Sequence, residues 1–266
     1  MDNFTSNLWV TIQGFFIRWA MNRVVFLIDG FNLYHSIVDI RHHHNGLLVK
    51  WLNIDSLCRS FLPIIGVGST LEKIYYFSAY AFHLQDPGVT QRHSDYIECL
   101  KSTGIEPILG RFKPKDVGCP LCNNVFVKHE EKETDVAIAT KLLEVFTLKQ
   151  CETVVLVTGD TDLVPAIKTA KYLFPANTVL FAFPFARKNK ELAKLAPNSF
   201  KIHVNSYISN QFPILWFYPA AIQYTNLQIG NSINEGIERI IAQHRQSPLM
   251  PGLQQVDQVA SLIGVS

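Results

Sequence analysis

The chain has 266 residues, of which 48% are hydrophobic and 17% are charged, a composition too apolar for an intrinsically disordered chain. The 24 Lys and Arg residues against 22 Asp and Glu residues leave a formal net charge of +2, so binding of a polyanion would depend on local clusters of positive charge. The five cysteines are an odd number scattered along the chain, which argues against a disulfide framework and favours a reducing compartment such as the cytosol.

The first apolar run, residues 8–17, is too short and too polar to cross a membrane. A spanning helix needs about 20 apolar residues, whereas this run contains Gln13 and ends at Arg18. It also lacks the basic start of a secretory signal. We therefore predict no membrane association, and we expect residues 1–22 to be an N-terminal extension, either preceding the true start at Met21 or forming a loosely attached amphipathic segment.

Residues 23–205 alternate short apolar runs with helical patterns, which is typical of an α/β fold with a mainly parallel sheet. The predicted strands span residues 24–28, 73–78, 105–109, 153–157, 178–182 and 200–204. The predicted helices span residues 53–61, 90–102, 134–146, 162–174 and 189–194. The alternation then stops, so we expect residues 206–266 to be a partly flexible C-terminal extension.

Acidic side chains follow the two most apolar strands. Asp29 ends the first strand, and Asp160 and Asp162 follow the strand over residues 153–157. In open α/β sheets the ligand crevice lies beyond the carboxyl ends of the strands. The sequence therefore predicts that these acids, with Thr158 between them, lie at one edge of the sheet.

A third acid, Asp135, is predicted at the start of a helix, on its apolar face. The stripe formed by Ala139, Leu142 and Phe146 extends back by one turn to Asp135, where an unpaired charge is costly. Clustered carboxylates repel one another unless a cation holds them together, and Mg²⁺ or Mn²⁺ prefers oxygen ligands. This pattern favours metal-assisted hydrolysis of a phosphodiester. Taken singly, each acid has a purely structural alternative. Asp160 or Asp162 is compatible with a helix N-cap, Asp135 with a favourable helix-dipole charge, and Asp29 with a plain turn before Gly30.

Three motifs, in this order, resemble the NYN-domain family, a branch of the PIN-like ribonucleases: IDGFNLYHS at residues 28–36, EEKETDVAIATKLL at 130–143 and VLVTGDTDLVPAIKTAK at 155–171. The resemblance implies a PIN-like three-layer α/β/α sandwich with an acidic metal site that cuts RNA. It assigns the metal to Asp29, Asp135 and Asp160, supporting catalytic roles to Asn32 and Asp162, and a position beside the site to Thr158. A homo-oligomer is compatible with the resemblance.

A Cys-x-x-Cys pair, Cys119 and Cys122, interrupts the domain near residues 116–130. The spacing is that of a zinc knuckle, but a closed zinc site needs four ligands. His129 is a candidate third ligand. The alternatives are a redox dithiol, which the surrounding Pro and Asn residues disfavour, and a loop with two incidental thiols. The adjacent His42, His43 and His44 are expected in a solvated loop.

Basic residues gather after the strand over 178–182, in the segment containing Arg187, Lys188 and Lys190. Together with Thr158 they are the predicted nucleic-acid-binding residues, because phosphate contacts need local positive charge. A second basic group precedes the Cys-x-x-Cys pair, at Arg111, Lys113 and Lys115. We expect single-stranded or loop RNA as the substrate, since a narrow acidic cleft excludes a rigid duplex and unpaired bases can stack on aromatic side chains.

Two other enzyme classes fit poorly. A phosphatase of the haloacid dehalogenase type needs a second acid at the position of Phe31, and a dinucleotide-binding domain needs a G-x-G-x-x-G run that residues 28–36 lack. The alternative that stays open is a non-catalytic RNA-binding or regulatory protein that retains the NYN fold. The sequence thus predicts a cytosolic ribonuclease that depends on Mg²⁺ or Mn²⁺.

Overall fold

The computed structural model describes residues 9–12, 15–18, 21–82, 86–118 and 124–213. The chain divides into two compact units, residues 1–211 and 212–266, and the elements described below belong to the first. Near the N-terminus, β1 (Trp9–Ile12) and β2 (Phe15–Arg18) pair antiparallel. Most of the predicted C-terminal extension, residues 206–266, lies outside the described residues.

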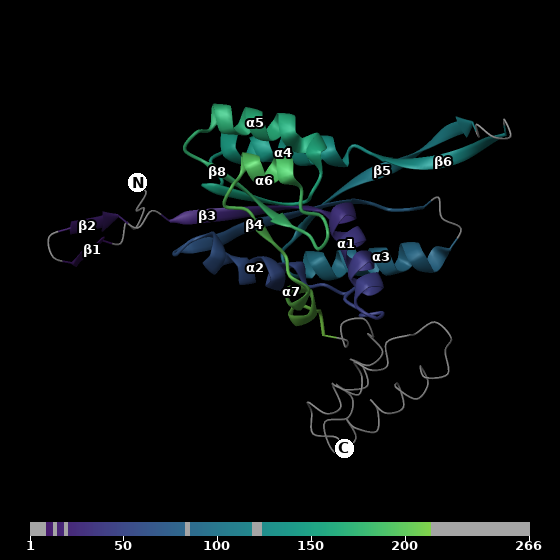
Figure 1. The fold of residues 1–266 in the computed structure, drawn as a ribbon, viewed down its shortest axis with the longest axis horizontal. Helices are drawn as coiled ribbons and strands as arrows, with labels where there is room; N and C mark the ends of the chain where they lie inside the picture. The colour runs from purple at the N-terminus through teal and green to yellow at the C-terminus, as the bar shows by residue number, and fades with distance from the viewer. Residues whose placement is uncertain (1–8, 13–14, 19–20, 83–85, 119–123, 214–266) are drawn as a thin grey trace, which may run out of the picture. The chain divides into compact units, whose positions relative to one another are not determined.

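A seven-stranded sheet forms the centre of the first unit (Figure 1). Its strands lie in the order β6-β5-β4-β3-β7-β8-β9, and they pair in parallel except for the antiparallel β5 and β6. The strands are β3 (Asn22–Asp29), β4 (Ser69–Ala79), β5 (Glu106–Gly118), β6 (Val125–Lys132), β7 (Thr153–Val157), β8 (Thr178–Phe183) and β9 (Phe200–Lys201).

Helices cover both faces of this sheet (Figure 1), which confirms the predicted three-layer α/β/α arrangement. One face carries α1 (Gly30–His43), α2 (Ile54–Ile65) and α3 (Pro87–Ser102). The opposite face carries α4 (Thr134–Thr147) and α5 (Val164–Leu173), which a short 3₁₀ helix, η1 (Thr161–Leu163), precedes. Two further short helices are α6 (Lys190–Leu195) and α7 (Val204–Ser209).

The two central strands explain why the sheet forms as it does. In β3, the residues from Val24 to Ile28 are all buried, as are the five residues of β7. Strands buried on both faces read as continuous apolar runs, and β-branched residues pack well on a pleated surface. These two strands pair in register from Val24 opposite Thr153 to Ile28 opposite Val157, so their carboxyl ends reach the same edge of the sheet together.

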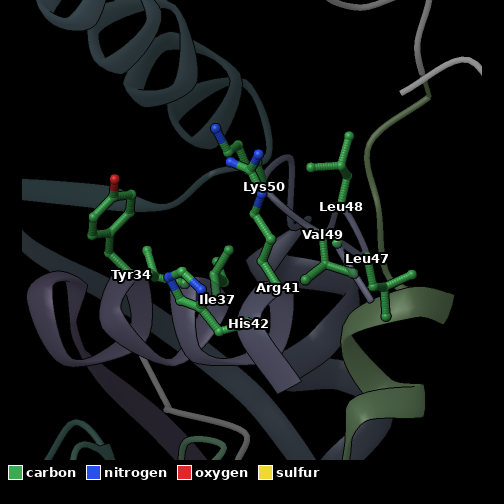
Figure 2. Close-up of a pocket in the computed structure, with 10 residues that line it drawn as sticks. Tyr34, Ile37, Arg41, His42, Leu47, Leu48, Val49 and Lys50 are labelled. Carbon is green, nitrogen blue, oxygen red and sulfur yellow. The ribbon is translucent and has the colours of Figure 1, made fainter. Parts of the chain in front are cut away.

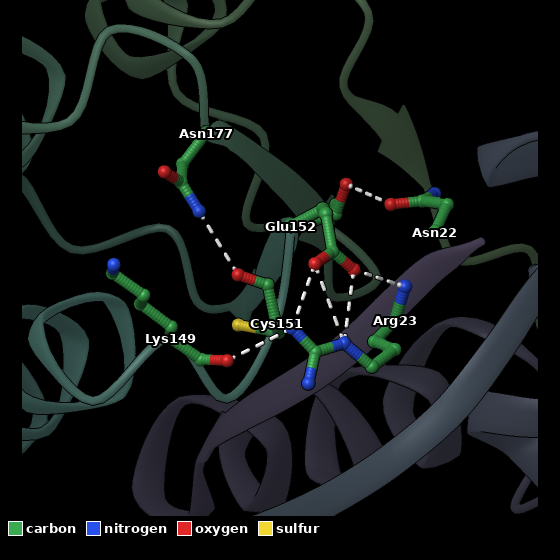
Figure 3. Close-up of polar contacts among 7 residues, drawn as sticks. Asn22, Arg23, Lys149, Cys151, Glu152 and Asn177 are labelled. Carbon is green, nitrogen blue, oxygen red and sulfur yellow. Dashed lines mark hydrogen bonds and ion pairs between the residues drawn. The ribbon is translucent and has the colours of Figure 1, made fainter. Parts of the chain in front are cut away.

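Polar contacts hold β3 and β7 together at the other, amino-terminal edge (Figure 3). The Arg23 guanidinium forms an ion pair of 2.7 Å with Glu152 and donates to the carbonyl oxygen of Lys149. The backbone N–H of Arg23 also donates to the Glu152 carboxylate, at 2.7 Å. Next to them, the Thr153 hydroxyl donates to the side-chain oxygen of Asn22. These contacts fix the register that aligns the carboxyl ends of the two strands.

The structure corrects two expectations about local structure. Residues 30–43 form α1, so His42 and His43 lie in its last turn rather than in a loop, and His44 is its C-cap. The strand predicted over residues 200–204 ends at Lys201, and α7 begins at Val204. Tyr207 of α7 is fully buried, and its hydroxyl bonds to Ser36 and accepts from the Phe185 N–H, so the first unit includes α7.

Candidate functional site

The predicted acids lie where the order of the parallel strands reverses. From β3 the chain crosses to β4 on one side, whereas β7 lies on the other side of β3. Asp29 is the last residue of β3, and Asp160 and Asp162 lie in the segment that follows β7. Ligand sites of open α/β sheets lie at such a switch point, outside the carboxyl ends of the strands.

Asp29 is a buried carboxylate held by hydrogen bonds to both of its oxygens. Its Oδ1 accepts the backbone N–H of Asn32 at 2.9 Å, which caps α1, and its Oδ2 accepts the Thr158 hydroxyl at 2.8 Å. Burial raises the pKa of Asp29, the hydrogen bonds from Asn32 and Thr158 lower it, and the charge of Asp160 raises it further. Asp29 therefore caps a helix rather than forming the plain turn that the sequence left open, and the charge of a second acid, Asp160, acts on the same carboxylate.

The loop after β7 is tied to the start of α1. The side-chain oxygen of Asn32 accepts the Gly159 N–H at 3.1 Å, and the Thr158 hydroxyl oxygen accepts the Asp160 N–H at 3.1 Å. Asp160 in turn accepts the Asp162 N–H at 2.9 Å and caps η1. Thr158 and Asn32 thus position the two acidic segments relative to each other.

Gly159 permits a very close approach of the next loop. A Cβ atom built on Gly159 would lie 2.0 Å from the carbonyl oxygen of Arg187, far inside any real contact. The loop between β8 and α6 therefore packs directly against the segment that carries Asp160. The sequence signal for this contact is Gly159 itself, which lies between Thr158 and Asp160 in the third motif.

Asp135 lies half-buried in the first turn of α4, and its pKa is raised to about 6. Burial is the largest cause, followed by the charges of Asp160, Asp29, Glu131 and Asp162. Leu142 and Phe146 on the same stripe are buried. The four predicted acids therefore share one electrostatic environment, and in the described part of the chain none of them forms an ion pair with Lys, Arg or His.

Glu131 is an acid of this environment that sequence reasoning did not single out. Its carboxylate accepts hydrogen bonds from the backbone N–H and the hydroxyl of Thr134, at the start of α4. The acidic run EEKETD at residues 130–135 was the available signal. Glu131, the second acid of this run, hydrogen-bonds to the start of α4 and adds negative charge next to Asp135.

The donor set is suited to a hard divalent cation. No three His, Cys, Asp or Glu side chains within the described ranges converge as a ready-made metal-binding group. Mg²⁺, however, is usually bound through one or two carboxylates, with waters and substrate phosphate as its other ligands. Oxygen donors from Asp29, Asp135 and Asp160, with no basic side chain paired to them, fit such an ion.

The predicted basic residues lie on the loop that contacts Gly159 and at the start of α6. Lys188 and Lys190 are exposed, and no ion pair involves either of them among the residues that the structure covers. Arg187 differs, because its guanidinium forms a 2.6 Å ion pair with Asp39 of α1 and its Nε is buried without a hydrogen bond. Arg187 therefore ties this loop to α1, while the two lysines are free to meet an anion.

The Cys-x-x-Cys pair lies between β5 and β6 in the sequence. Cys119 and Cys122 lie outside the described residues, so zinc binding stays a prediction, and His129 is on β6 opposite Pro114. On the β5–β6 hairpin, Lys115 pairs with Glu130, and Arg111 pairs with Glu133 just beyond it. The second basic group is thus largely neutralised. Of the cysteines that the structure describes, Cys58, Cys99 and Cys151 are free thiols.

Comparison with known proteins places the chain in a family. The family model of the NYN domain matches residues 23–203. Among solved structures, a protein of unknown function from Vibrio parahaemolyticus is similar, with 17% sequence identity, a TM-score of 0.46, and coverage of 70% of this chain and 95% of that chain. A search of curated proteins gave no match. Within the described residues, no helix has the length and apolar character that crossing a bilayer requires. The match over residues 23–203 covers most of the chain, which therefore belongs to the NYN domain family of PIN-like nucleases.

Proposed function

We propose that this protein is a divalent-metal-dependent ribonuclease that hydrolyses phosphodiester bonds of single-stranded or loop RNA. The observation that carries the proposal is the gathering of Asp29, Asp135 and Asp160 at the carboxyl edge of the sheet without a basic partner. Such an arrangement is costly for folding, and stability alone gives no reason to keep it. Membership of the NYN family supports the same conclusion.

In this proposal the carboxylates of Asp29, Asp135 and Asp160 hold the cation. A bound Mg²⁺ or Mn²⁺ lowers the pKa of a water molecule and neutralises charge on the phosphate oxygens. Asp162 lies on η1, the short helix that Asp160 caps. It would orient the attacking water by accepting a hydrogen bond from it. Asn32 and Thr158 act as positioning residues, since they hold the Asp29 and Asp160 segments together.

Lys188 and Lys190 would bind the RNA backbone beside the acids. Their loop packs against Gly159, so the positive charges lie close to the site without being paired to its carboxylates. Negative charge on the acids would otherwise repel a polyanion, and local cations offset that repulsion. Arg187 would contribute by fixing the loop through Asp39.

The test is cleavage of a labelled single-stranded RNA by the full chain, with Mg²⁺ or Mn²⁺ and with EDTA. The informative variants are Asp29→Asn and Asp160→Asn, which preserve side-chain size and one accepting oxygen for the caps. Asp116→Asn is the matched control, because Asp116 is an exposed acid on the β5–β6 hairpin. We expect cleavage by the wild type and the control only, and only with metal. RNA binding by all four proteins without cleavage would instead favour a regulatory RNA-binding protein.

A further inference from the structure

A second candidate site lies along α1, apart from the acids. A pocket of about 590 Å³ lies between the outer face of this helix and the segment over residues 46–50 (Figure 2). Among the residues that line it, Tyr34 has a large aromatic ring, and Arg41 and Lys50 have positively charged groups. Neither the proposed catalytic residues nor the predicted basic loop contributes to it.

Two cationic side chains, Arg41 and Lys50, line this pocket. Figure 2 shows Arg41 and Lys50 together in this pocket. The charges of Arg41 and of Arg92 on α3 add to the larger effect of burial in lowering the pKa of Lys50. In the part of the chain that the structure describes, neither Arg41 nor Lys50 forms an ion pair. The acids of α1 and α3 have other partners: Asp39 with Arg187, Asp86 with Arg92 at 3.9 Å, Asp95 with Gln91, and Glu98 with Lys101.

The wall of the pocket opposite α1 is firmly anchored. Val49 and Leu52 are fully buried. The Leu52 carbonyl oxygen accepts the Tyr96 hydroxyl of α3 at 2.7 Å, and Leu52 forms a β-bridge with Gln211. Buried residues therefore flank Lys50 in the sequence. Packing of this segment, rather than an ion pair with an acid, keeps the Lys50 ammonium close to other positive charges.

The pocket lies along α1, the helix that Asp29 of the acidic site caps at its N-terminus. Asp29 caps α1, and Tyr34, Val38 and Arg41 follow one another on the same helical face, spaced by four and three residues. At a rise of 1.5 Å per residue, Arg41 lies about 18 Å along the helix axis from Asp29. Tyr34 lies between them, with 56% of its surface exposed, and Figure 2 shows its ring at one side of the pocket and Arg41 and Lys50 together at another.

We propose that this pocket binds the RNA strand a few nucleotides away from the scissile phosphate, with a base stacked on Tyr34 and a phosphate bound by Arg41 and Lys50. Unpaired bases stack on aromatic rings whatever their identity, and lysine and arginine bind the backbone. The combination of one exposed ring with unpaired cations, spaced along a path from the acids, suits a strand better than a free phosphate. The inference rests on the proposed function, because it takes Asp29 as the place where the strand is cut.

Binding of a fluorescein-labelled 12-nucleotide oligouridylate, measured by anisotropy in EDTA, tests the pocket without requiring cleavage. We expect the double substitution Arg41→Gln, Lys50→Gln to lower affinity at least about tenfold. It should also reduce the slope of log K against log salt by about 0.7, the contribution of the one phosphate that the two side chains bind together. The matched control is Lys168→Gln, Lys201→Gln, which removes two exposed lysines from α5 and β9. It should bind as the wild type does.

Tyr34 provides an independent measurement. We expect Tyr34→Ala to weaken binding at least about fivefold, the lower end of the effect of losing a base stack, and Tyr34→Phe to bind normally. Equal losses in both Tyr34 variants would overturn the stacking role. If the Arg41, Lys50 double variant shows the same affinity and salt slope as the Lys168, Lys201 control, the phosphate-binding role fails. The role in binding a strand also fails if inorganic phosphate displaces the 12-mer at concentrations where an equal ionic strength of another salt does not.

The outcomes for the pocket and for the catalytic proposal can be separated. If the wild type binds the 12-mer through these residues but cleaves no RNA, the pocket stands and the ribonuclease proposal fails. If the wild type cleaves RNA while the pocket variants match the lysine control, the pocket alone fails. If the wild type binds no RNA, both fail. Circular dichroism and thermal unfolding of each variant verify that a loss of binding does not reflect a loss of fold.

Discussion

The Thr158 hydroxyl donates a 2.8 Å hydrogen bond to the Asp29 carboxylate and accepts the N–H of Asp160. One buried side chain thereby connects the ends of the two central strands and the two acids that follow from them. A hydroxyl supplies one donor and two acceptor lone pairs, and here the donor goes to one acid segment and an acceptor to the other. The distance between the acids thus depends on a residue with no charge of its own.

Replacing Thr158 by Val should therefore weaken both the fold and the activity. The substitution keeps the side-chain shape but leaves the Asp160 N–H without its acceptor and Oδ2 of Asp29 without the Thr158 donor. We expect the free energy of unfolding to fall by about 1–3 kcal/mol, the cost of leaving buried polar groups unsatisfied, measured by urea denaturation. Metal-dependent RNA cleavage should fall as well. Thr158→Ser, which keeps the hydroxyl, should restore most of both, and a Ser variant as impaired as Val would contradict this role.

Gly159 should tolerate no side chain at all. The Cβ atom of Gly159→Ala would meet the backbone carbonyl of Arg187 at 2.0 Å, so the loop that carries Lys188 would have to move away. Overpacking of this kind costs about 1–3 kcal/mol or more. Gly118→Ala is the matched control, because a Cβ there meets nothing within 4 Å. Thermal unfolding should separate the two variants clearly, and unchanged stability and cleavage in Gly159→Ala would refute the close packing.

The sequence predicted the elements whose cause is local and missed those whose cause is tertiary. The strand over residues 153–157 was predicted with the observed bounds, because a buried parallel strand is apolar throughout. Helix α1 was not predicted: its exposed face is polar and its end carries three histidines, so periodicity alone is weak there, and its start depends on the Asp29 cap. Residues 202–204 were predicted to end a strand because the run FKIHV is rich in β-branched and aromatic residues, but α7 begins at Val204, and Ile202 and Tyr207 are both buried.

The same distinction applies to the site. The position of Asp29, Asp135 and Asp160 at one edge followed from strand ends and helix periodicity. The pairing of Arg187 with Asp39, 148 positions apart, could not be read from local sequence, and it changes the role expected of a residue within a basic cluster. The cations of the α1 pocket likewise come from a helix and a segment with no shared motif, so only the fold brings Arg41 and Lys50 together.

The raised pKa of Asp135, about 6, gives the protein a definite pH dependence in the absence of metal. A carboxyl whose pKa is higher in the folded than in the unfolded state holds its proton better when folded, so its contribution to stability is present at low pH and is lost as pH rises through about 6. Asp29 shifts in the same direction. In EDTA, Asp135→Asn should therefore be more stable than the wild type at pH 7.5, by about 1–2 kcal/mol after allowance for its partial exposure.

This advantage of Asp135→Asn should disappear near pH 4, where the wild-type carboxyl is protonated, and the variant should cleave no RNA. Urea denaturation at several pH values measures the first effect, with Asp116→Asn as the control that should follow the wild type throughout. A stability difference that does not change between pH 4 and 7.5 would contradict repulsion and burial as its cause. Wild-type cleavage at fixed Mg²⁺ should also rise with pH, but over a range below 6, because a bound cation favours the ionised carboxyl and lowers its pKa from the metal-free value.

A divalent cation should relieve the same repulsion and so stabilise the fold. A ligand that binds only the folded state at a concentration 100 times its dissociation constant adds about 2.7 kcal/mol to the free energy of unfolding. We expect the melting temperature of the wild type to rise as Mn²⁺ or Mg²⁺ is added and to return to its starting value with EDTA. The rise should be small or absent in Asp160→Asn, which keeps the cap of η1 but removes a charge. Asp116→Asn should respond as the wild type does, because its carboxylate lies on the hairpin. An equal rise in Asp160→Asn would place the bound ion elsewhere and would separate the acids at the sheet edge from metal binding.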